Sequence, residues 1–260
     1  MELAAQDTVA ALDADFGAMA VRIGVHAWGL PQLTMREKAF VFVAADLCSH
    51  NLRFPLRTHA TMAMSNGVTL EDLREAVRHL APYVGYPTAA EALLSLAELE
   101  EQIAGRSVLD GQAAGPPALD GQAAGRPAPG ELGDGARRRA PARPGRRESG
   151  MVAPVTRLPG DVRAGVRRLD TDFAGFLEQQ FDERWGRPNL SLRERALCTI
   201  ATDVLNGTLD ASFRLHIDIA LGNGADEQQV RAVLLLVAEF GIARAWRAYA
   251  ALAEILDRRA

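Results

Sequence analysis

A chain of 260 residues is long enough for two domains of ordinary size, and its 48% hydrophobic content is sufficient for packed cores. The formal net charge of −4 argues against a protein that binds nucleic acids through a basic surface. The only two cysteines, Cys48 and Cys198, exclude a disulfide framework and fit a reducing compartment.

The first residues of the chain carry acidic side chains, whereas a signal peptide opens with basic residues and an apolar core. No stretch approaches the roughly 18 uninterrupted apolar residues that a helix needs to span a bilayer. We therefore expect a cytoplasmic protein whose partners include neither a membrane nor a nucleic acid.

An internal repeat dominates the sequence. Residues 13–77 recur at 170–234, 157 positions later, with 19 identities in 65 ungapped positions. After a one-residue deletion the register resumes, and Gly85 matches Gly241. Because chance similarity does not hold one register over this length, we predict two copies of one module, at residues 1–105 and 156–260.

The patterns of the N-terminal copy predict five helices. Thr34 and Glu37 form a capping box, in which each side chain bonds to a free backbone N–H group of the helix start. The apolar run that follows is rich in β-branched residues, as strands are, but the cap and the length favour a buried helix. Asn66–Gly67 ends the next helix, and Thr69 caps the one after it. The five helices are expected near residues 4–27, 34–49, 53–65, 70–83 and 86–104.

A segment of different composition separates the copies. Residues 109–118 and 119–128 are a tandem decapeptide, and a stretch rich in Gly, Pro and Arg follows. Such a segment cannot bury enough apolar surface to offset the entropy of ordering it. We predict a disordered linker over residues 106–155, whose arginines are solvated.

The C-terminal copy repeats the helical signals. Ser191 and Glu194 form the second capping box, Asn223–Gly224 is the helix stop, and Asp226 is the next cap. Helices are expected near residues 160–184, 191–206, 209–222, 226–240 and 242–258. The fold class is therefore all-α, with two copies of one helical module.

Three motifs of the N-terminal copy occur in a characteristic order: L-T-x-R-E-K at a helix start, a helix with His59, and A-x-x-N-G-V-T-x-E-D-L-x-E-A-V. Y-V-G-Y-P-T-A-A-E-A-L closes the copy. In this order, residues 33–99 resemble the carboxymuconolactone decarboxylase family, which includes alkylhydroperoxidase D-like proteins. Residues 190–256 keep the first part but lack the closing Tyr and Pro. The resemblance implies an alkylhydroperoxidase D-like fold, two copies packed as a pseudo-dimer, and self-association, for example as a trimer of fused modules.

The redox branch of the family carries E-x11-C-x2-C-x3-H. Neither copy has the two cysteines of this pattern, because other residues stand at their positions: Leu52 and Pro55 before His59, and Leu209 and Ser212 before His216. Dithiol chemistry needs a thiolate with a resolving partner, so a hydroperoxide reductase is the least favoured function. The decarboxylase branch often has Glu four residues before the histidine, and both copies lack that as well.

Both copies nevertheless retain an aspartate, Asp46 or Asp203, together with a histidine and, two residues before the histidine, an arginine. A histidine serves as general acid or base near neutral pH, and an arginine clamps carboxylates or enolates. The candidates for catalysis are His59 and His216, and those for substrate binding are Arg57, Tyr83, Tyr86 and Arg214. A buried core histidine is the competing interpretation of His59, since residues two apart do not share a helix face. Asp46 and His50, at i and i+4, are interpreted as a surface pair or cap.

The predicted function is a cofactor-independent lyase/decarboxylase or isomerase/cyclase. It acts on a small carboxylate or lactone-like carbonyl compound by proton transfer through histidine. The five histidines show no metal-binding spacing, so we expect neither a metal nor a cofactor. The alternative is a non-catalytic scaffold or ligand-binding member of the family. A pocket that brings Arg57 and His59 together with Tyr83 or Tyr86 would favour the enzyme.

Overall fold

The computed structural model describes residues 2–113 and 157–259, and all regular structure within them is helical, as predicted. Every helix in these ranges is too short or too polar to cross a lipid bilayer. The N-terminal copy comprises α1 (Gln6–Leu12), α2 (Ala14–Gly29), α3 (Met35–Cys48), α4 (Phe54–Ser65), α5 (Leu70–Val84) and α6 (Tyr86–Ala113). The C-terminal copy comprises α7 (Gly160–Leu169), α8 (Thr171–Trp185), α9 (Leu192–Asn206), α10 (Ala211–Gly222), α11 (Glu227–Val237), the 3-10 turn η1 (Ala238–Phe240) and α12 (Ile242–Asp257).

Helices α3 and α9 are the centre of the core. Residues 37–47 and 195–205 are buried without exception, so neither helix has the periodicity of a surface helix. Their starts are defined by the predicted capping boxes, in which the backbone N–H groups of Thr34 and Ser191 donate to Glu37 at 2.8 Å and Glu194 at 2.7 Å. The apolar runs by themselves would also suit a strand, and the capping boxes explain why these segments form helices.

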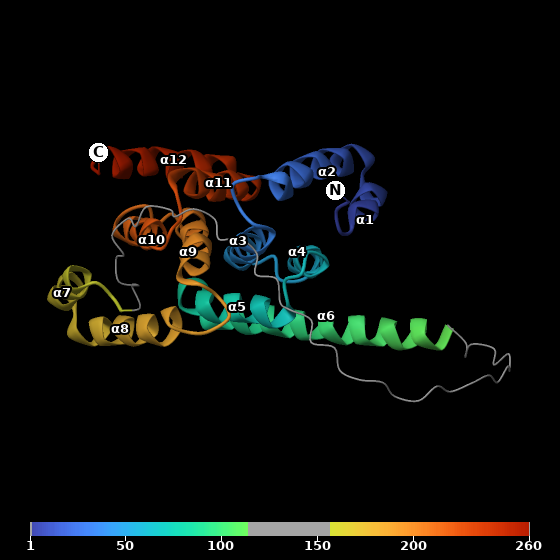
Figure 1. Cartoon of the computed structure of the whole chain (residues 1–260), viewed down its shortest axis with the longest axis horizontal. Helices are drawn as coiled ribbons and strands as arrows, with labels where there is room; N and C mark the ends of the chain where they lie inside the picture. The colour runs from blue at the N-terminus through green and yellow to red at the C-terminus, as the bar shows by residue number, and fades with distance from the viewer. Residues whose placement is uncertain (1, 114–156, 260) are drawn as a thin grey trace, which may run out of the picture. The chain divides into compact units, whose positions relative to one another are not determined.

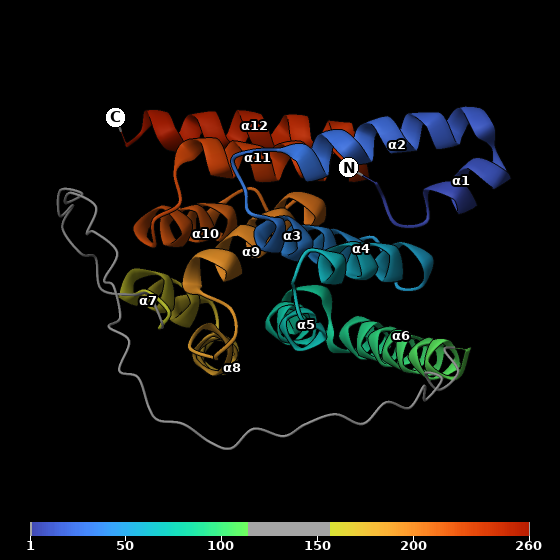
Figure 2. The same cartoon turned by 45° about the vertical axis from the view of Figure 1, so that its right-hand side comes forward.

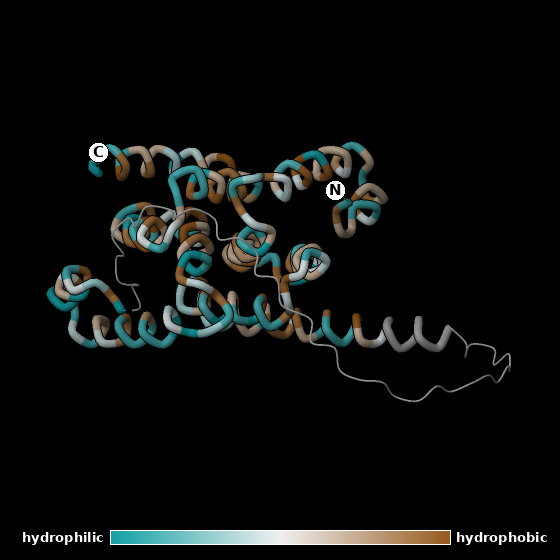
Figure 3. Tube along the Cα trace, in the orientation of Figure 1, coloured by the Kyte–Doolittle hydropathy of each residue, from teal (hydrophilic) through white to brown (hydrophobic). Residues whose placement is uncertain are grey.

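The two copies pack through these equivalent helices. Helices α10, α9, α3 and α4 lie in a row, in which α9 and α3 are the touching pair (Figures 1 and 2). Helix α11 packs on α3 of the other copy, and α5 packs on α9 in the same way. Hydrophobic residues recur between hydrophilic ones along α2 and α12, which cover one side of the row (Figure 3). The arrangement is the expected pairing of two related modules.

The first helix expected in each copy is in fact two helices. Asp13 has extended backbone angles, φ −158° and ψ 118°, and its carboxylate accepts from the N–H of Phe16 at 2.7 Å. Asp170 does the same for Phe173 at 2.7 Å. An aspartate in this conformation caps a new helix start, so the chain breaks there. The single helices expected over 4–27 and 160–184 were therefore wrong.

Helix α6 continues past the expected end of the first copy, to Ala113. The rest of the expected linker, residues 114–155, lies outside the described residues. The described residues up to Gln102 and from Arg157 onward form one compact unit, which contains both copies. Residues Ile103–Ala113, the end of α6, belong to a second unit.

A buried ion-pair network joins the copies. The Glu75 carboxylate on α5 accepts from Arg187 at 2.8 and 2.9 Å and from the fully buried Arg195 at 3.0 Å. Burial acts to raise the pKa of Glu75, but hydrogen bonds from the two arginines outweigh it and lower the pKa below 4.5. Glu75 is thus ionised at neutral pH and compensates a charge that has no access to water.

Replacing Glu75 is expected to destabilise the fold. Glu75→Ala leaves Arg195 buried without a counterion, at a cost of about 3–5 kcal/mol in the free energy of unfolding measured by urea titration. The exposed Glu71, which pairs with Arg78, gives the control Glu71→Ala, expected to cost about 0–1 kcal/mol.

The contribution of Glu75 to the free energy of unfolding is expected to decrease as the pH falls. A carboxyl group whose pKa is lowered by folding stabilises the native state above its unfolded value of 4.5 and stops doing so as the pH falls through its folded pKa. The stability difference between wild type and Glu75→Ala should therefore shrink below pH 4.5. A difference that stays constant on acidification would contradict this role of Glu75.

Candidate functional site

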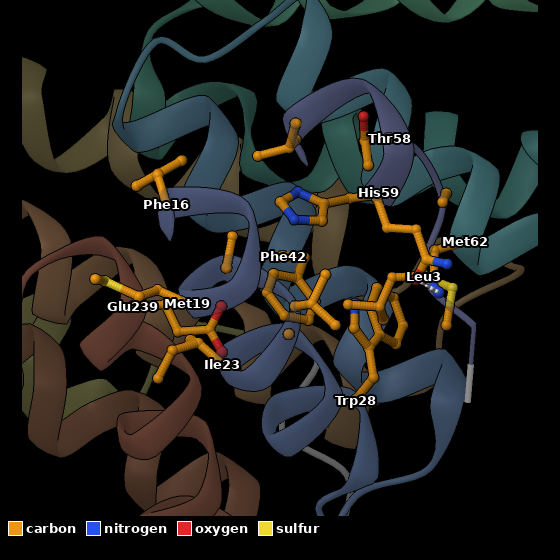
Figure 4. Close-up of a pocket in the computed structure, with 16 residues that line it drawn as sticks. Leu3, Phe16, Met19, Ile23, Trp28, Phe42, Thr58, His59, Met62 and Glu239 are labelled. Carbon is orange, nitrogen blue, oxygen red and sulfur yellow. Dashed lines mark hydrogen bonds between the residues drawn. The ribbon is translucent and has the colours of Figure 1, made fainter. Parts of the chain in front are cut away.

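The imidazole of the N-terminal copy is held by a buried carboxylate. His59 lies on α4, and its Nδ1 is 2.7 Å from Oδ2 of Asp46 on α3, whose side chain is fully buried. A carboxylate at Nδ1 accepts the proton of that nitrogen, which leaves Nε2 of the neutral imidazole as a proton acceptor. Figure 4 shows the ring of His59 directed into a pocket. The arrangement suits a general base.

Aromatic rings determine the plane of this imidazole. Phe42 stacks on His59 with 4.5 Å between the ring centroids and 21° between the planes, and Trp28 stacks on Phe42 at 4.7 Å. The ring centroid of Phe240, from the C-terminal copy, lies 6.2 Å from that of Phe42 and 6.2 Å from that of His59. Together with the Asp46 contact, the stack leaves the ring of His59 little rotational freedom.

A pocket of about 380 Å³ opens beside His59, a size within the range of small-molecule sites. Its wall is mostly apolar, and His59 and Glu239 are the two ionisable groups among the described residues that line it. The lining comes from the N-terminal residues, α1, α2, α3, α4 and η1 (Figure 4): Leu3, Ala4, Gln6, Val9, Phe16, Met19, Ala20, Val21, Ile23, Gly24, Trp28, Phe42, Thr58, His59, Met62 and Glu239.

Glu239 has an unusual carboxyl group. The residue as a whole is exposed, but its carboxyl group extends toward the centre of the apolar pocket in Figure 4. Burial raises the pKa of this carboxyl to about 7, against the opposing effect of the His59 charge. Near neutral pH Glu239 therefore occurs in both its protonated and its ionised form. The pocket thus holds a basic nitrogen and a carboxyl group that titrates near neutrality.

The C-terminal copy contains the same dyad with more partners. Nδ1 of His216 lies 2.6 Å from Oδ2 of Asp203. The second carboxylate oxygen of Asp203 accepts from Thr208 at 2.8 Å and from Ser212 at 2.7 Å. The corresponding oxygen of Asp46 is buried and has no hydrogen-bond partner among the described residues. His59 is thus the one hydrogen-bond partner that the described residues offer the Asp46 carboxylate.

Aromatic side chains enclose His216. Trp185 stacks on it with 5.7 Å between centroids and 10° between planes, and Tyr83 of the N-terminal copy presents an edge at 5.5 Å. The indole N–H of Trp185 donates to the Tyr83 hydroxyl at 3.1 Å, which fixes the two rings together. The side chain of His216 is 3% exposed, against 20% for His59. The two predicted histidines therefore differ in access.

The two arginines expected to bind substrate point elsewhere. Arg57 donates from Nε to Ser95 at 3.0 Å and pairs with Glu98, both on α6. Arg214 lines a separate pocket, which it shares with Glu254 of α12. Neither arginine is among the residues that line the pocket at His59. The reason is the helix geometry, which turns residues two positions apart to different faces.

The two tyrosines also lie away from His59. Tyr83 contacts His216 of the other copy, and Tyr86 donates to Gln180 at 2.5 Å and accepts from Arg184, both on α8. Among the described lining residues of the pocket at His59 there is neither Arg57 nor either tyrosine, so the convergence that would have favoured the enzyme is not found. Packing against the C-terminal copy turns this end of the N-terminal copy toward the other histidine.

Two residues of the site were given no role from the sequence. Asp46 was noted as retained, because an aspartate precedes each histidine by 13 positions, but the i, i+4 spacing suggested His50 as its neighbour. His50 is exposed just beyond α3, but Asp46 is fully buried and pairs with His59, so the interpretation of these two residues as a surface pair was wrong. Glu239 had no sequence signal, since it reaches the site from the C-terminal copy.

Burial raises the pKa of both cysteines, Cys48 and Cys198, to about 12, so each carries a protonated thiol at neutral pH. A peroxidatic cysteine needs the opposite, a thiolate. Within residues 2–113 and 157–259, no group of three or more His, Cys, Asp or Glu side chains is placed to hold a metal ion.

A family model described as the carboxymuconolactone decarboxylase family matches residues 14–98 and 173–254, nearly two-thirds of the chain. The two matched segments correspond to the two copies and include both His–Asp dyads. No curated protein matches the chain.

The two imidazoles are expected to differ in reactivity. Diethyl pyrocarbonate acylates the free nitrogen of a neutral imidazole, and peptide mass spectrometry reports each site. We expect His59 to react at least on the order of 10-fold faster than His216, which reacts only through local opening. The exposed His26 provides the reference rate for an open imidazole. Equal rates at His59 and His216 would contradict the difference in access.

Proposed function

Because the chain belongs to the carboxymuconolactone decarboxylase family, we propose that it is a cofactor-independent lyase, isomerase or cyclase. In this proposal His59 moves a proton next to the carbonyl group of a small lactone-like compound. The observation that carries the proposal is the Asp46–His59 dyad at the wall of an apolar pocket, with 2.7 Å between Oδ2 and Nδ1. The enclosed His216 has the same kind of carboxylate partner but is not among the residues that line this pocket, so the pocket is what distinguishes His59.

The dyad supplies the base. Nε2 of His59 takes a proton from the carbon next to the carbonyl, and the buried Asp46 compensates the positive charge that the ring acquires. Burial raises the pKa of Asp46, while the charge and hydrogen bond of His59 act to lower it. The buried Asp46 carboxylate is stabilised electrostatically when its partner His59 becomes a cation. This stabilisation favours proton uptake by His59.

The pocket wall indicates the substrate class. Within the described part of the chain, its lining residues include neither Lys nor Arg, so a free carboxylate would lose its hydration without a counterion. An uncharged ring, such as a lactone, loses much less. This favours the lactone-like compound over the small carboxylate among the substrates that the sequence suggested.

Ligand binding without catalysis is the second candidate, and the predominantly apolar lining favours it. The two candidates differ in what His59 does. A binding protein would retain its affinity and have no proton transfer to lose when His59 is replaced by a residue of similar size.

Turnover is expected to depend on His59. With α-angelica lactone in heavy water, proton NMR follows deuterium uptake at the carbon next to the carbonyl. His59→Gln should slow this exchange by about 10²–10⁴-fold, the usual contribution of a positioned base. Lactone affinity, followed by the intrinsic tryptophan fluorescence to which Trp28 at the pocket wall contributes, should change little.

His26→Gln is the matched control, because His26 is an exposed histidine that is not among the pocket-lining residues. Wild-type exchange no faster than that in buffer, together with lactone binding, would support the binding protein instead. Equal exchange in wild type and His59→Gln would remove the histidine from the mechanism.

Self-association is also proposed. Ile242 and Trp246 of α12 are 78% and 75% exposed, an unusual exposure for large apolar side chains, and they offer a surface for a second copy. Sedimentation velocity should find an assembly larger than the monomer, and Trp246→Glu should dissociate it. A monomeric wild type at micromolar concentration would refute this.

A further inference from the structure

One residue of the C-terminal copy reaches the pocket of the N-terminal copy. Among the described residues that line this pocket, Glu239 alone comes from beyond residue 62. Its carboxyl group and the imidazole of His59 both border the pocket, and no hydrogen bond is drawn between these two described residues in Figure 4. They are separate polar groups on an otherwise apolar wall, with the pocket available between them.

A change in backbone places Glu239 there. Ala81 of the first copy corresponds to Ala238 of the second, and Gly85 corresponds to Gly241. Three residues lie between these positions in the first copy and two in the second, so the C-terminal copy has lost one residue here. Helix α5 continues regularly through the segment, whereas α11 ends at Val237 and continues as the 3-10 turn η1. The tighter turn and the deletion present Glu239 and Phe240 to His59, where the opposite site receives Tyr83.

We propose that Glu239 is a catalytic acid, which delivers a proton to the substrate while His59 removes another. The two copies then form one composite site, which catalyses allylic proton shifts in unsaturated ring carbonyl compounds. This inference rests on the proposed role of His59. It adds a second proton-transfer group and a narrower reaction class: isomerisation of a β,γ-unsaturated to a conjugated carbonyl compound.

The proton balance is complete without a further reactant. His59 Nε2 forms its N–H bond as the α-carbon C–H bond breaks, and the electron pair delocalises over the carbonyl group and the double bond. The γ-carbon then takes the proton of the Glu239 carboxyl group, and its new C–H bond completes the conjugated product. Proton exchange with water afterwards returns His59 to the neutral and Glu239 to the protonated form.

The electrostatics of the pocket are consistent with these roles. Burial raises the pKa of Glu239 to about 7, so a large share of the carboxyl groups is protonated at neutral pH. Helices α1 and α2 present uncharged side chains to the pocket, α4 presents His59, and α3 places Asp46 against the far nitrogen of the imidazole. A carboxyl group that still carries its proton near neutrality can act as the acid beside an imidazole base in the same pocket.

The test separates the two transfers in α-angelica lactone. Deuterium uptake at the α-carbon reports His59, and formation of the conjugated isomer reports protonation at the γ-carbon. In Glu239→Gln we expect α-exchange within a few-fold of wild type and isomer formation slowed by about 10²-fold. Glu239→Asp should restore part of the isomerisation. Glu91→Gln, on the exposed surface of α6, is the control.

The pH profile provides a second readout. Wild-type isomerisation should fall as the pH rises through about 7, because Glu239 loses the proton that it donates, and Glu239→Gln should lack this fall. Isomerisation that is equal in wild type and Glu239→Gln, or α-exchange without isomerisation in wild type, would overturn the role of Glu239 and leave that of His59 intact. Absence of α-exchange in wild type would instead remove the proposed function, and this inference with it.

Discussion

The packing of α3 against α9 is the contact on which the rest of the structure depends. The two helices are equivalent in sequence and are buried on every side, so each copy completes its core with the central helix of the other. This pairing brings α11 onto α3 and α5 onto α9. As a consequence, the end of one helix in each copy faces the histidine of the other copy, and neither site belongs to one copy alone.

Duplication has produced two sites that share a dyad and differ in surroundings. At His216 the carboxylate is saturated by Thr208 and Ser212, and Trp185 covers the imidazole. At His59 the Asp46 carboxylate has one hydrogen-bond partner within the described ranges, and the imidazole borders a pocket. A saturated, enclosed polar cluster contributes specificity to a core, whereas an incompletely satisfied one beside a cavity is typical of a reactive site.

Local signals predicted most of the helices. The capping boxes at Thr34 and Ser191 lie where the pattern placed them, because a cap needs only residues three positions apart. The breaks at Asp13 and Asp170 were equally local but were overlooked, since an aspartate within a helical pattern also suits a solvated face. Arg57 shows the limit of motif reasoning: its retention in both copies suggested a substrate clamp, yet it pairs with Glu98.

The amino-acid sequence by itself determined that one helical module occurs twice, where its central helices begin, and that each copy carries a histidine at an equivalent place. These properties depend on periodicity, caps and repetition, which act over a few residues or are visible by comparison within the chain. Tertiary structure alone decided which histidine borders a pocket and that Glu239 accompanies it. The two residues are 180 positions apart, and only the packing of one copy on the other brings them to the same cavity.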